Sequence, residues 1–209
     1  MLFRSVSGFY KEFEDPIERV LRNVGEGRFV GFQNVESATV YGAEFEARKR
    51  LDAFTSNPIL GRISIGGNLS LVRSQVDIPK EEMVIILASD RDADNTRQLI
   101  GQSPYLVNLN AVYENIETGT AVGLYYTVFG DRLLAVTEGA TPDVFEEARA
   151  DLDLTVSRKV SQDFRMKLSA KNLLGTDMRQ IQSFKGTDYE YLSYSRSRTF
   201  SLGLTYEIN

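Results

Sequence analysis

The last residues of the chain alternate between apolar and polar side chains. In the segment SLGLTYEIN, residues 201–209, leucine, tyrosine and isoleucine occupy every second position from Leu202 to Ile208. The positions between them are small or polar. A period of two is typical of a β-strand that has one face in an apolar environment and the other in a polar one.

The same alternation recurs in about eight segments, which are separated by turn residues. None of these segments has a convincing helical period. The segments span 6–13, 32–50, 63–71, 105–114, 122–128, 151–157, 166–171 and 201–209. A series of alternating strands without helices predicts an all-β architecture.

The connectors between these segments differ in length on the two sides. On one side they are short or moderate, at 52–61, 115–119 and 161–163. On the other side they are long and polar, at 79–103, 130–149 and 175–195. Outer-membrane barrels have short periplasmic turns and long extracellular loops, so the asymmetry favours such a barrel. Alternation alone also fits a soluble β-sandwich, because the pattern does not say whether the apolar face points inward or outward.

Composition removes several classes of function. The formal net charge of −5 argues against a nucleic-acid binder, which needs a basic patch. The chain has no cysteine and no histidine, so it lacks thiolate ligands, the commonest metal ligand and the usual general base. No set of nucleophile, base and oxyanion donor can be assembled from the remaining residues, so we expect neither an enzyme nor a cofactor.

Three short stretches are candidates for sites. The segment DRDADN spaces Asp90, Asp92 and Asp94 as calcium ligands are spaced in an EF-hand loop, but the glycine and the glutamate of that loop are absent. A solvated acidic loop is therefore the favoured interpretation, and calcium binding is the alternative. Glu44 and Glu46 share a face like a glycosidase pair, yet we expect them to face a polar lumen. The apolar run MVIILA at Met83–Ala88 is predicted as a short extra strand beyond the membrane, with a ligand-contact surface as the alternative.

The hairpin around 161–163 allows a prediction of register. The apolar residues of both its strands occupy even positions, from Leu152 to Val156 and from Met166 to Ala170. Directly opposed residues share a face, so the numbers of paired residues must sum to an even number. A three-residue turn then opposes Val156 to Leu168 and Leu154 to Ala170, and on the other face Asp153 to Lys171.

Longer stretches resemble the successive C-terminal strands of TonB-dependent outer-membrane receptors. They are FYKEFEDPIERV (9–20), NVESATVYGAEFEARKRL (34–51), RQLIGQSPYLVNLNAVYE (97–114), YYTVFGDRL (125–133) and LSAKNLLGTD (168–177). The resemblance covers nearly the whole chain in the family's order. It implies an antiparallel up-and-down transmembrane β-barrel segment, about eight strands of a larger barrel of about 22 strands, with the apolar faces toward lipid.

The tail is also similar to the outer-membrane assembly signal of this family. The matching residues are Ser201, Gly203, Tyr206 and Ile208, although the family usually ends on an aromatic residue where Ile208 stands. The resemblance implies that the barrel-assembly machinery reads this strand. It also implies that the last strand pairs with the first strand of the complete barrel, because an unpaired edge is not tolerated in lipid.

The family's plug domain and energy-coupling box are not found in residues 1–209. We therefore expect the C-terminal part of a receptor barrel in the cell outer membrane, as a fragment or a truncated gene product, with all strand pairs antiparallel and with open edges at its first and last strands. The implied partners are outer-membrane lipid and, in the full-length receptor, the plug domain, TonB and an imported ligand. The implied solute classes are siderophore-iron, cobalamin and glycans, and the residues that bind the solute are unknown.

Two other functions compete with this one. The first is a stand-alone eight-stranded barrel that serves as an anchor or adhesin, since eight strands can close alone. The second is a soluble lipocalin-like binding barrel with an apolar interior. A soluble binder would be monodisperse without detergent, and a stand-alone barrel would pair residues 6–13 with residues 199–208.

Overall fold

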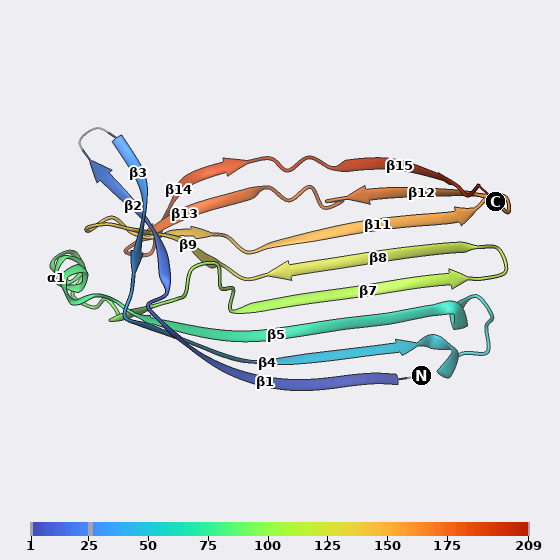
Figure 1. Ribbon diagram of the computed structural model, residues 1–209, viewed down its shortest axis with the longest axis horizontal. Helices are drawn as coiled ribbons and strands as arrows, with labels where there is room; N and C mark the ends of the chain where they lie inside the picture. The colour runs from blue at the N-terminus through green and yellow to red at the C-terminus, as the bar shows by residue number, and fades with distance from the viewer. Residues whose placement is uncertain (1, 25–26, 209) are drawn as a thin grey trace.

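The computed structural model describes residues 2–24 and 27–208, and two sheets account for most of it (Figure 1). The larger sheet has the order β1 (Leu2–Glu14), β4 (Ser37–Arg50), β5 (Ile63–Asp77), β7 (Tyr105–Asn115), β8 (Thr120–Phe129), β11 (Arg149–Lys159), β12 (Phe164–Lys171) and β15 (Thr199–Tyr206), and β6 (Thr96–Arg97) pairs with β5. The eight strands of this path are called the wall below.

The smaller sheet lies at one end of the wall. Its order is β14 (Thr187–Tyr194), β13 (Met178–Phe184), β10 (Val144–Glu146), β9 (Arg132–Thr137), β2 (Ile17–Val24) and β3 (Gly27–Asn34). The helix α1 (Lys80–Ser89) lies at the same end, and the short 3-10 helices η1 (Leu51–Ala53) and η2 (Leu60–Arg62) lie at the opposite end, between β4 and β5 (Figure 1). The smaller sheet, β6 and α1 are called the loop layer.

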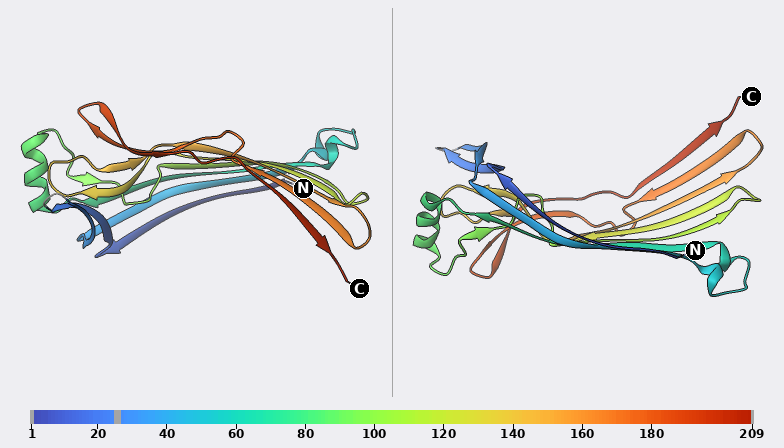
Figure 2. Two further views of the ribbon diagram at one scale, coloured as in Figure 1. Left: turned by 90° about the horizontal axis from the view of Figure 1, so that it is seen from above. Right: turned by 60° about the horizontal axis from the view of Figure 1, so that its bottom comes forward.

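The wall is an open sheet whose first and last strands are its edges. Every pair of neighbours along its path is antiparallel, and β1 and β15 lie at opposite ends of the order. Figure 2 shows that the sheet curves and twists without closing. The prediction of open edges is therefore confirmed. The prediction that every pair would be antiparallel is wrong at one place, because β2 pairs with β9 in parallel.

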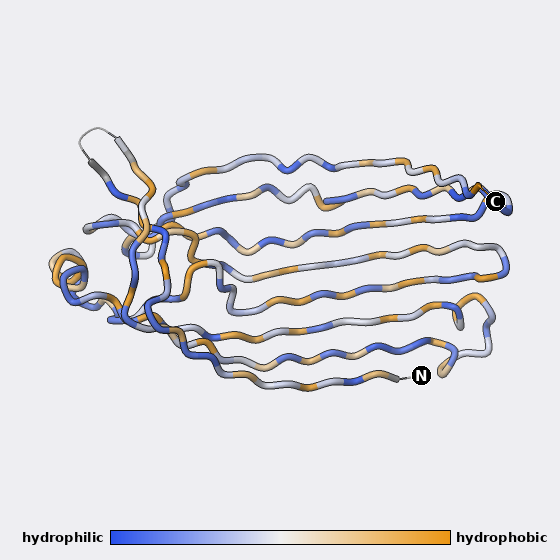
Figure 3. Tube along the Cα trace, in the orientation of Figure 1, coloured by the Kyte–Doolittle hydropathy of each residue, from blue (hydrophilic) through white to orange (hydrophobic). Residues whose placement is uncertain are grey.

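The registers place the predicted apolar residues of the wall on a single face. Across the middle of the wall, Gly67 opposes Leu109, Leu109 opposes Tyr126, and Tyr126 opposes Leu152. The next row belongs to the other face and is polar, with Asn68 opposite Asn108. Figure 3 shows the resulting alternation of hydrophobic and hydrophilic positions along the strands.

The apolar face of the wall is not covered by another layer of the described chain. Val6 is 73% exposed and Leu202 is 59% exposed, although both sit in regular strands. Soluble proteins rarely expose a contiguous apolar surface of this extent. The fully buried apolar residues instead cluster in and next to the loop layer, around Val144 in one cluster and around Val76 in another.

The hairpin of β11 and β12 has the predicted register. Val156 pairs with Leu168 and Leu154 with Ala170, and the ladder ends at the second of these pairs. The expected ion pair between Asp153 and Lys171 is not among the ion pairs of the described residues. The carboxylate of Asp153 instead accepts a hydrogen bond from the backbone N–H of Asn172 at 2.9 Å, so the chain turns away at the point where that pair was expected.

The predicted strand at Met83–Ala88 is wrong, because this run lies inside the helix α1. Pro79 is the N-cap, and Glu81 and Glu82 occupy the first turn, where acidic side chains interact favourably with the helix dipole. A short apolar run does not distinguish a strand from a helix by periodicity, and the flanking residues decided the outcome. No helix in the described part of the chain is long and apolar enough to cross a bilayer.

Candidate functional site at the loop end of the wall

Arg97 is at the centre of a buried charge cluster in the loop layer. Its guanidinium donates to Glu18 of β2 from Nε at 3.1 Å and from Nη2 at 2.5 Å. It also donates from Nη1 to Glu82 of α1 at 2.5 Å. The Glu18 side chain is fully buried and that of Arg97 is 7% exposed. The cluster therefore joins β2, β6 and α1, since separating the partners would leave uncompensated buried charges.

The pKa of Arg97 reflects two opposing influences. Burial lowers the pKa of the guanidinium, because burial disfavours the charged form. The hydrogen bonds with Glu18 and Glu82, together with their negative charges, outweigh burial and raise the pKa above its usual value. Arg97 thus remains a cation inside the loop layer.

Asp143, which precedes β10, lies close to this cluster. Burial raises the pKa of its carboxyl to about 6, although a hydrogen bond from the backbone N–H of Thr137 at 2.8 Å and the charge of Arg97 oppose the increase. The charges of Glu82 and Glu18 add to it. The Asp143 carboxyl therefore gains or loses its proton at about pH 6, where an ordinary aspartate is already ionised.

A second charge cluster joins the loop layer to the wall. Glu146 of β10 is fully buried and accepts hydrogen bonds from Arg132 at 2.8 Å and from Arg149 at 3.2 Å. The ring of Phe129 lies 4.7 Å from the Arg132 guanidinium and 4.8 Å from that of Arg149. Both guanidinium groups are close enough to this ring for a cation–π contribution. The ends of β8, β9, β10 and β11 are fixed together in this way.

A row of polar side chains continues from this cluster across the polar face of the wall. Asp151 accepts hydrogen bonds from Arg196, which lies between β14 and β15, at 3.0 and 3.1 Å. In the adjacent strands Thr127 donates to Asn108 at 2.7 Å, and Asn108 donates to Asn68 at 2.8 Å. The polar face is thus a connected hydrogen-bonding surface, whereas the opposite face is apolar.

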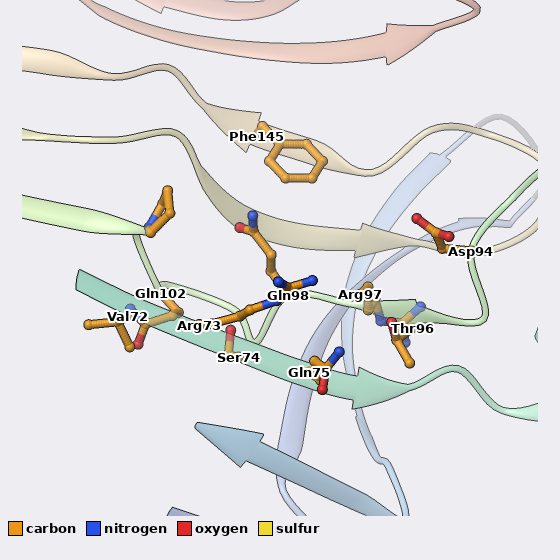
Figure 4. A pocket seen from close by; sticks show the side chains of 11 residues that line it. Val72, Arg73, Ser74, Gln75, Asp94, Thr96, Arg97, Gln98, Gln102 and Phe145 are labelled. Atoms are coloured by element: carbon orange, nitrogen blue, oxygen red, sulfur yellow. The ribbon is translucent and has the colours of Figure 1, made fainter. Parts of the chain in front are cut away.

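A pocket of about 560 Å³ opens between β5, the segment 94–104 and β10 (Figure 4). Gln98 and Phe145 both line it, and the side chain of Gln98 extends toward the ring of Phe145 (Figure 4). Gln98 Oε1 is buried and has no hydrogen-bond partner among the described residues. An unpaired buried amide oxygen costs free energy that a donor group on a bound molecule would recover. One aromatic ring among amide, hydroxyl and guanidinium groups suits a polar solute.

The acidic residues with calcium-like spacing are not brought together as a group in the described part of the chain. Asp90 is the C-cap of α1, and its carboxylate accepts the backbone N–H of Asp92 at 3.2 Å, which is a local turn. Asp94 lines the pocket of Figure 4. Within the described ranges, no three acidic side chains come together as metal ligands. Glu44 and Glu46 oppose Ser70 and Asn68, so they lie on the polar face as expected.

The residues of the predicted assembly signal lie in and just after the edge strand. Ser201, Gly203 and Tyr206 belong to β15, and Ile208 follows it. Tyr206 is on the apolar face, opposite Phe164, and Ser201 and Gly203 are on the polar face. Recognition of this strand by the assembly machinery stays a prediction.

The sequence analysis did not identify Glu18, Glu82, Arg97 or Gln98. Glu18 and Arg97 are 79 positions apart, and no local pattern connects them. One signal was present for Glu82, since a proline followed by two acidic residues before an apolar run is typical of a helix N-terminus. The partners of Arg97 become visible only when the strands are arranged in space.

Comparisons with known proteins agree with this architecture. The chain is similar to the copper transporter OprC, with 16% identity and a TM-score of 0.63, over 98% of this chain and 29% of that one. It is also similar to the closed form of the ferric-catecholate import receptor Fiu from E. coli K12, with 17% identity and a TM-score of 0.59, over 98% of this chain and 25% of that one. The chain thus spans less than a third of the length of these proteins. A search of curated proteins gave no match.

At these levels of identity the solved structures show the fold alone. A family comparison goes further, because the family described as TonB dependent receptor-like, beta-barrel matches residues 3–173. The match covers every strand of the wall except the last, β15. The chain therefore belongs to the TonB-dependent receptor-like β-barrel family.

Proposed function

We propose that this chain is the C-terminal part of the barrel of an outer-membrane receptor that imports a scarce solute with energy transmitted by TonB. In this proposal the apolar face of the wall contacts lipid and the polar face lines the lumen around a plug domain. The short turns lie on the periplasmic side, and the loop layer lies outside the cell, where it contacts the solute.

The observation that carries the proposal is the open wall, whose one face is mainly apolar and uncovered. A stand-alone eight-stranded barrel would bond β1 to β15, whereas these strands are opposite edges of the sheet. A lipocalin-like protein would cover its apolar face with the rest of the barrel, whereas here Val6 and Leu202 are exposed. Further strands, joined to both edges, would remove the unpaired backbone groups from lipid.

The loop layer supplies the proposed contact with the solute. The two charge clusters hold its strands on the end of the wall, and the pocket beside Gln98 and Phe145 opens between them. The solute classes proposed for the receptor are siderophore-iron, cobalamin and glycans. The barrel-assembly machinery, which is proposed to read β15, is a partner during insertion.

Uptake measurements test the proposal. Cells that lack the protein are compared with complemented cells for accumulation of a labelled ferric siderophore, cobalamin and an oligosaccharide, each with and without TonB. We expect one solute to accumulate only when both the protein and TonB are present. Two results would contradict the proposed function. One is accumulation of that solute without TonB, and the other is that all three solutes accumulate to the same level in cells with and without the protein.

A variant of the pocket sharpens this test. Gln98→Ala removes the buried unpaired amide, whereas Gln75→Ala removes a second glutamine of the same pocket lining as a matched control. We expect Q98A to weaken binding of the imported solute more than Q75A at equal surface expression. Equal effects of the two variants would exclude Gln98 Oε1 as a contact.

A further inference from the structure

A groove lies on the apolar face of the wall near the short-turn end. It has a volume of about 690 Å³ and is bordered by β1, β4, β5, β7 and the turn that follows β4. The groove is deep at its centre because two small residues, Ala47 and Gly67, lie opposite each other there. Val6, Phe45 and Leu109 form its sides. The groove therefore offers an extended apolar channel on the face that we assign to lipid.

An aromatic residue closes one end of the groove. Phe54 lies in the turn after η1, lines the groove and is 76% exposed. The ammonium group of Lys49 lies 5.4 Å from the centre of its ring. Outer-membrane barrels carry girdles of aromatic residues at both membrane interfaces. Phe54 and Lys49 together mark this end of the groove as its headgroup end.

Two cations at this end have no acidic partner within residues 2–24 and 27–208. Arg4 opposes Ala47, and Lys49 opposes Ile65, so both side chains lie on the apolar face. Neither takes part in an ion pair of the described chain, and Asp52 in the adjacent turn is paired with Arg50 at 3.5 Å. Cations that have long aliphatic stems extend from an apolar surface to the lipid headgroups. The arrangement is complementary to a negative group placed between Arg4 and Lys49.

We propose that the groove binds one anionic phospholipid of the periplasmic leaflet. Its acyl chain lies along Ala47 and Gly67, and its phosphate contacts Arg4 and Lys49 beside Phe54. The proposal rests on the membrane placement given under the proposed function. Arg158 distinguishes this site from a general attraction of anionic lipid. It also lies on the apolar face near a short turn, opposite Met166, but it does not line this groove. A general attraction would involve Arg158 as well, whereas the proposed site would not.

Fluorescence quenching tests the site. The chain has no tryptophan, so Phe54→Trp adds a reporter at the headgroup end, and the signal is the difference between F54W and its parent. The full-length protein is reconstituted into phosphatidylcholine vesicles that contain an equal minor fraction of brominated phosphatidylglycerol or brominated phosphatidylcholine. We expect brominated phosphatidylglycerol to quench more strongly than brominated phosphatidylcholine, with an apparent preference on the order of tenfold. Each cation near the membrane surface adds to the attraction of the anionic lipid.

Four variants in the F54W background locate the preference. R4Q/K49Q should abolish it, and R4K/K49R should keep it, because the charges remain. A47L fills the groove and leaves both cations, so it should also abolish the preference. R158Q should leave it unchanged. Circular dichroism of the reconstituted variants shows whether each is folded, and a misfolded R4Q/K49Q leaves A47L and R158Q to decide.

The failures are distinguishable. Equal quenching of the F54W signal by the two lipids, without any further substitution, would overturn the lipid site and leave the membrane placement standing. Loss of the preference in R158Q, or its retention in A47L, would show general electrostatic attraction and overturn the groove. Absence of quenching by either lipid would contradict the membrane placement on which the proposal depends.

Discussion

The wall and the loop layer solve the problem of burial in opposite ways. The loop layer has its own core, in which Leu133 and Val144 are fully buried, and it neutralises Glu18 and Glu146 with arginines. The wall has regular strands but leaves large apolar residues such as Leu168 uncovered. The loop layer is therefore built as a soluble protein is built, whereas the wall depends on lipid for its apolar face and on further strands for its edges.

The largest expected difference concerns the buried ion pairs of the loop layer. Glu18→Ala leaves Arg97 buried without its main partner and should lower the local free energy of opening by about 3–5 kcal/mol. The matched control is Glu117→Ala, which removes an exposed pair with Arg62 at 2.9 Å and should cost less than about 1 kcal/mol. Hydrogen exchange of β2 and β9 measures the change in E18A, and hydrogen exchange of β7 and β8, which flank Glu117, measures the change in E117A. Equal effects would show that the Arg97 cluster does not stabilise the loop layer.

Truncation of a leucine should also distinguish the two regions. Leu133→Ala opens a cavity in the loop-layer core and should cost about 2–5 kcal/mol. Leu168→Ala on the apolar face of the wall should cost less, because lipid chains refill the space and no cavity remains. Urea unfolding of the reconstituted protein compares the two variants. A larger loss for L168A would mean that a protein layer covers this face.

A lysine placed on adjacent residues of β5 distinguishes the two faces of the wall. Leu69→Lys puts a charge into lipid and should cost about 2–4 kcal/mol if it lies near the bilayer centre. Ser70→Lys puts the same charge on the polar face, opposite Glu44, and should change stability little. Yield of folded protein in the outer membrane and urea unfolding report the difference. If S70K were the more damaging variant, the faces would be assigned the wrong way round.

The smallest expected effect is a pH dependence of the loop layer. Because the pKa of Asp143 is raised to about 6, its folded state holds a proton that the unfolded state has already lost. This carboxyl therefore destabilises the fold as the pH rises from about 4 through about 6, by at most about 3 kcal/mol. Asp143→Asn should remove this part of the pH profile in hydrogen exchange at β9. An unchanged profile would show that Asp143 is not responsible.

The sequence predicted the wall well because its rule is local and repeats. The period of two in β7, β11 and β12 sets the faces, and the even positions of Leu154 and Leu168 are enough to set the hairpin register. The loop layer follows no such repeat. Its connectors were expected to be polar loops, yet they contain β9, β10, β13 and β14. Pairing of β2 with β9 depends on contacts far apart in the sequence.

The candidate site was missed for the same reason. Arg97 and Glu18 form a pair only after β2 and β6 have been brought together, and neither residue stands out in its own segment. The error at Met83–Ala88 has a different cause, since an apolar run flanked by Pro79 and two glutamates carried a helix signal that the prevailing strand pattern outweighed. Local sequence patterns are thus enough to predict the wall. The loop layer, which we propose contacts the solute, can be described only from contacts between residues far apart in the sequence.

The central claim, that the apolar face of the wall contacts lipid, is tested most directly by spin labels along β7. Residues 1–209 contain no cysteine. In the reconstituted full-length protein, with any cysteine outside these residues replaced, single cysteines at 106–112 can therefore each carry one nitroxide. The account predicts that accessibility to oxygen, which dissolves in lipid, peaks at positions 107, 109 and 111. Accessibility to a polar nickel reagent should be low at these positions and higher at 108 and 110. Oxygen accessibility that peaks at 108 and 110, or that shows no period of two, would contradict the account.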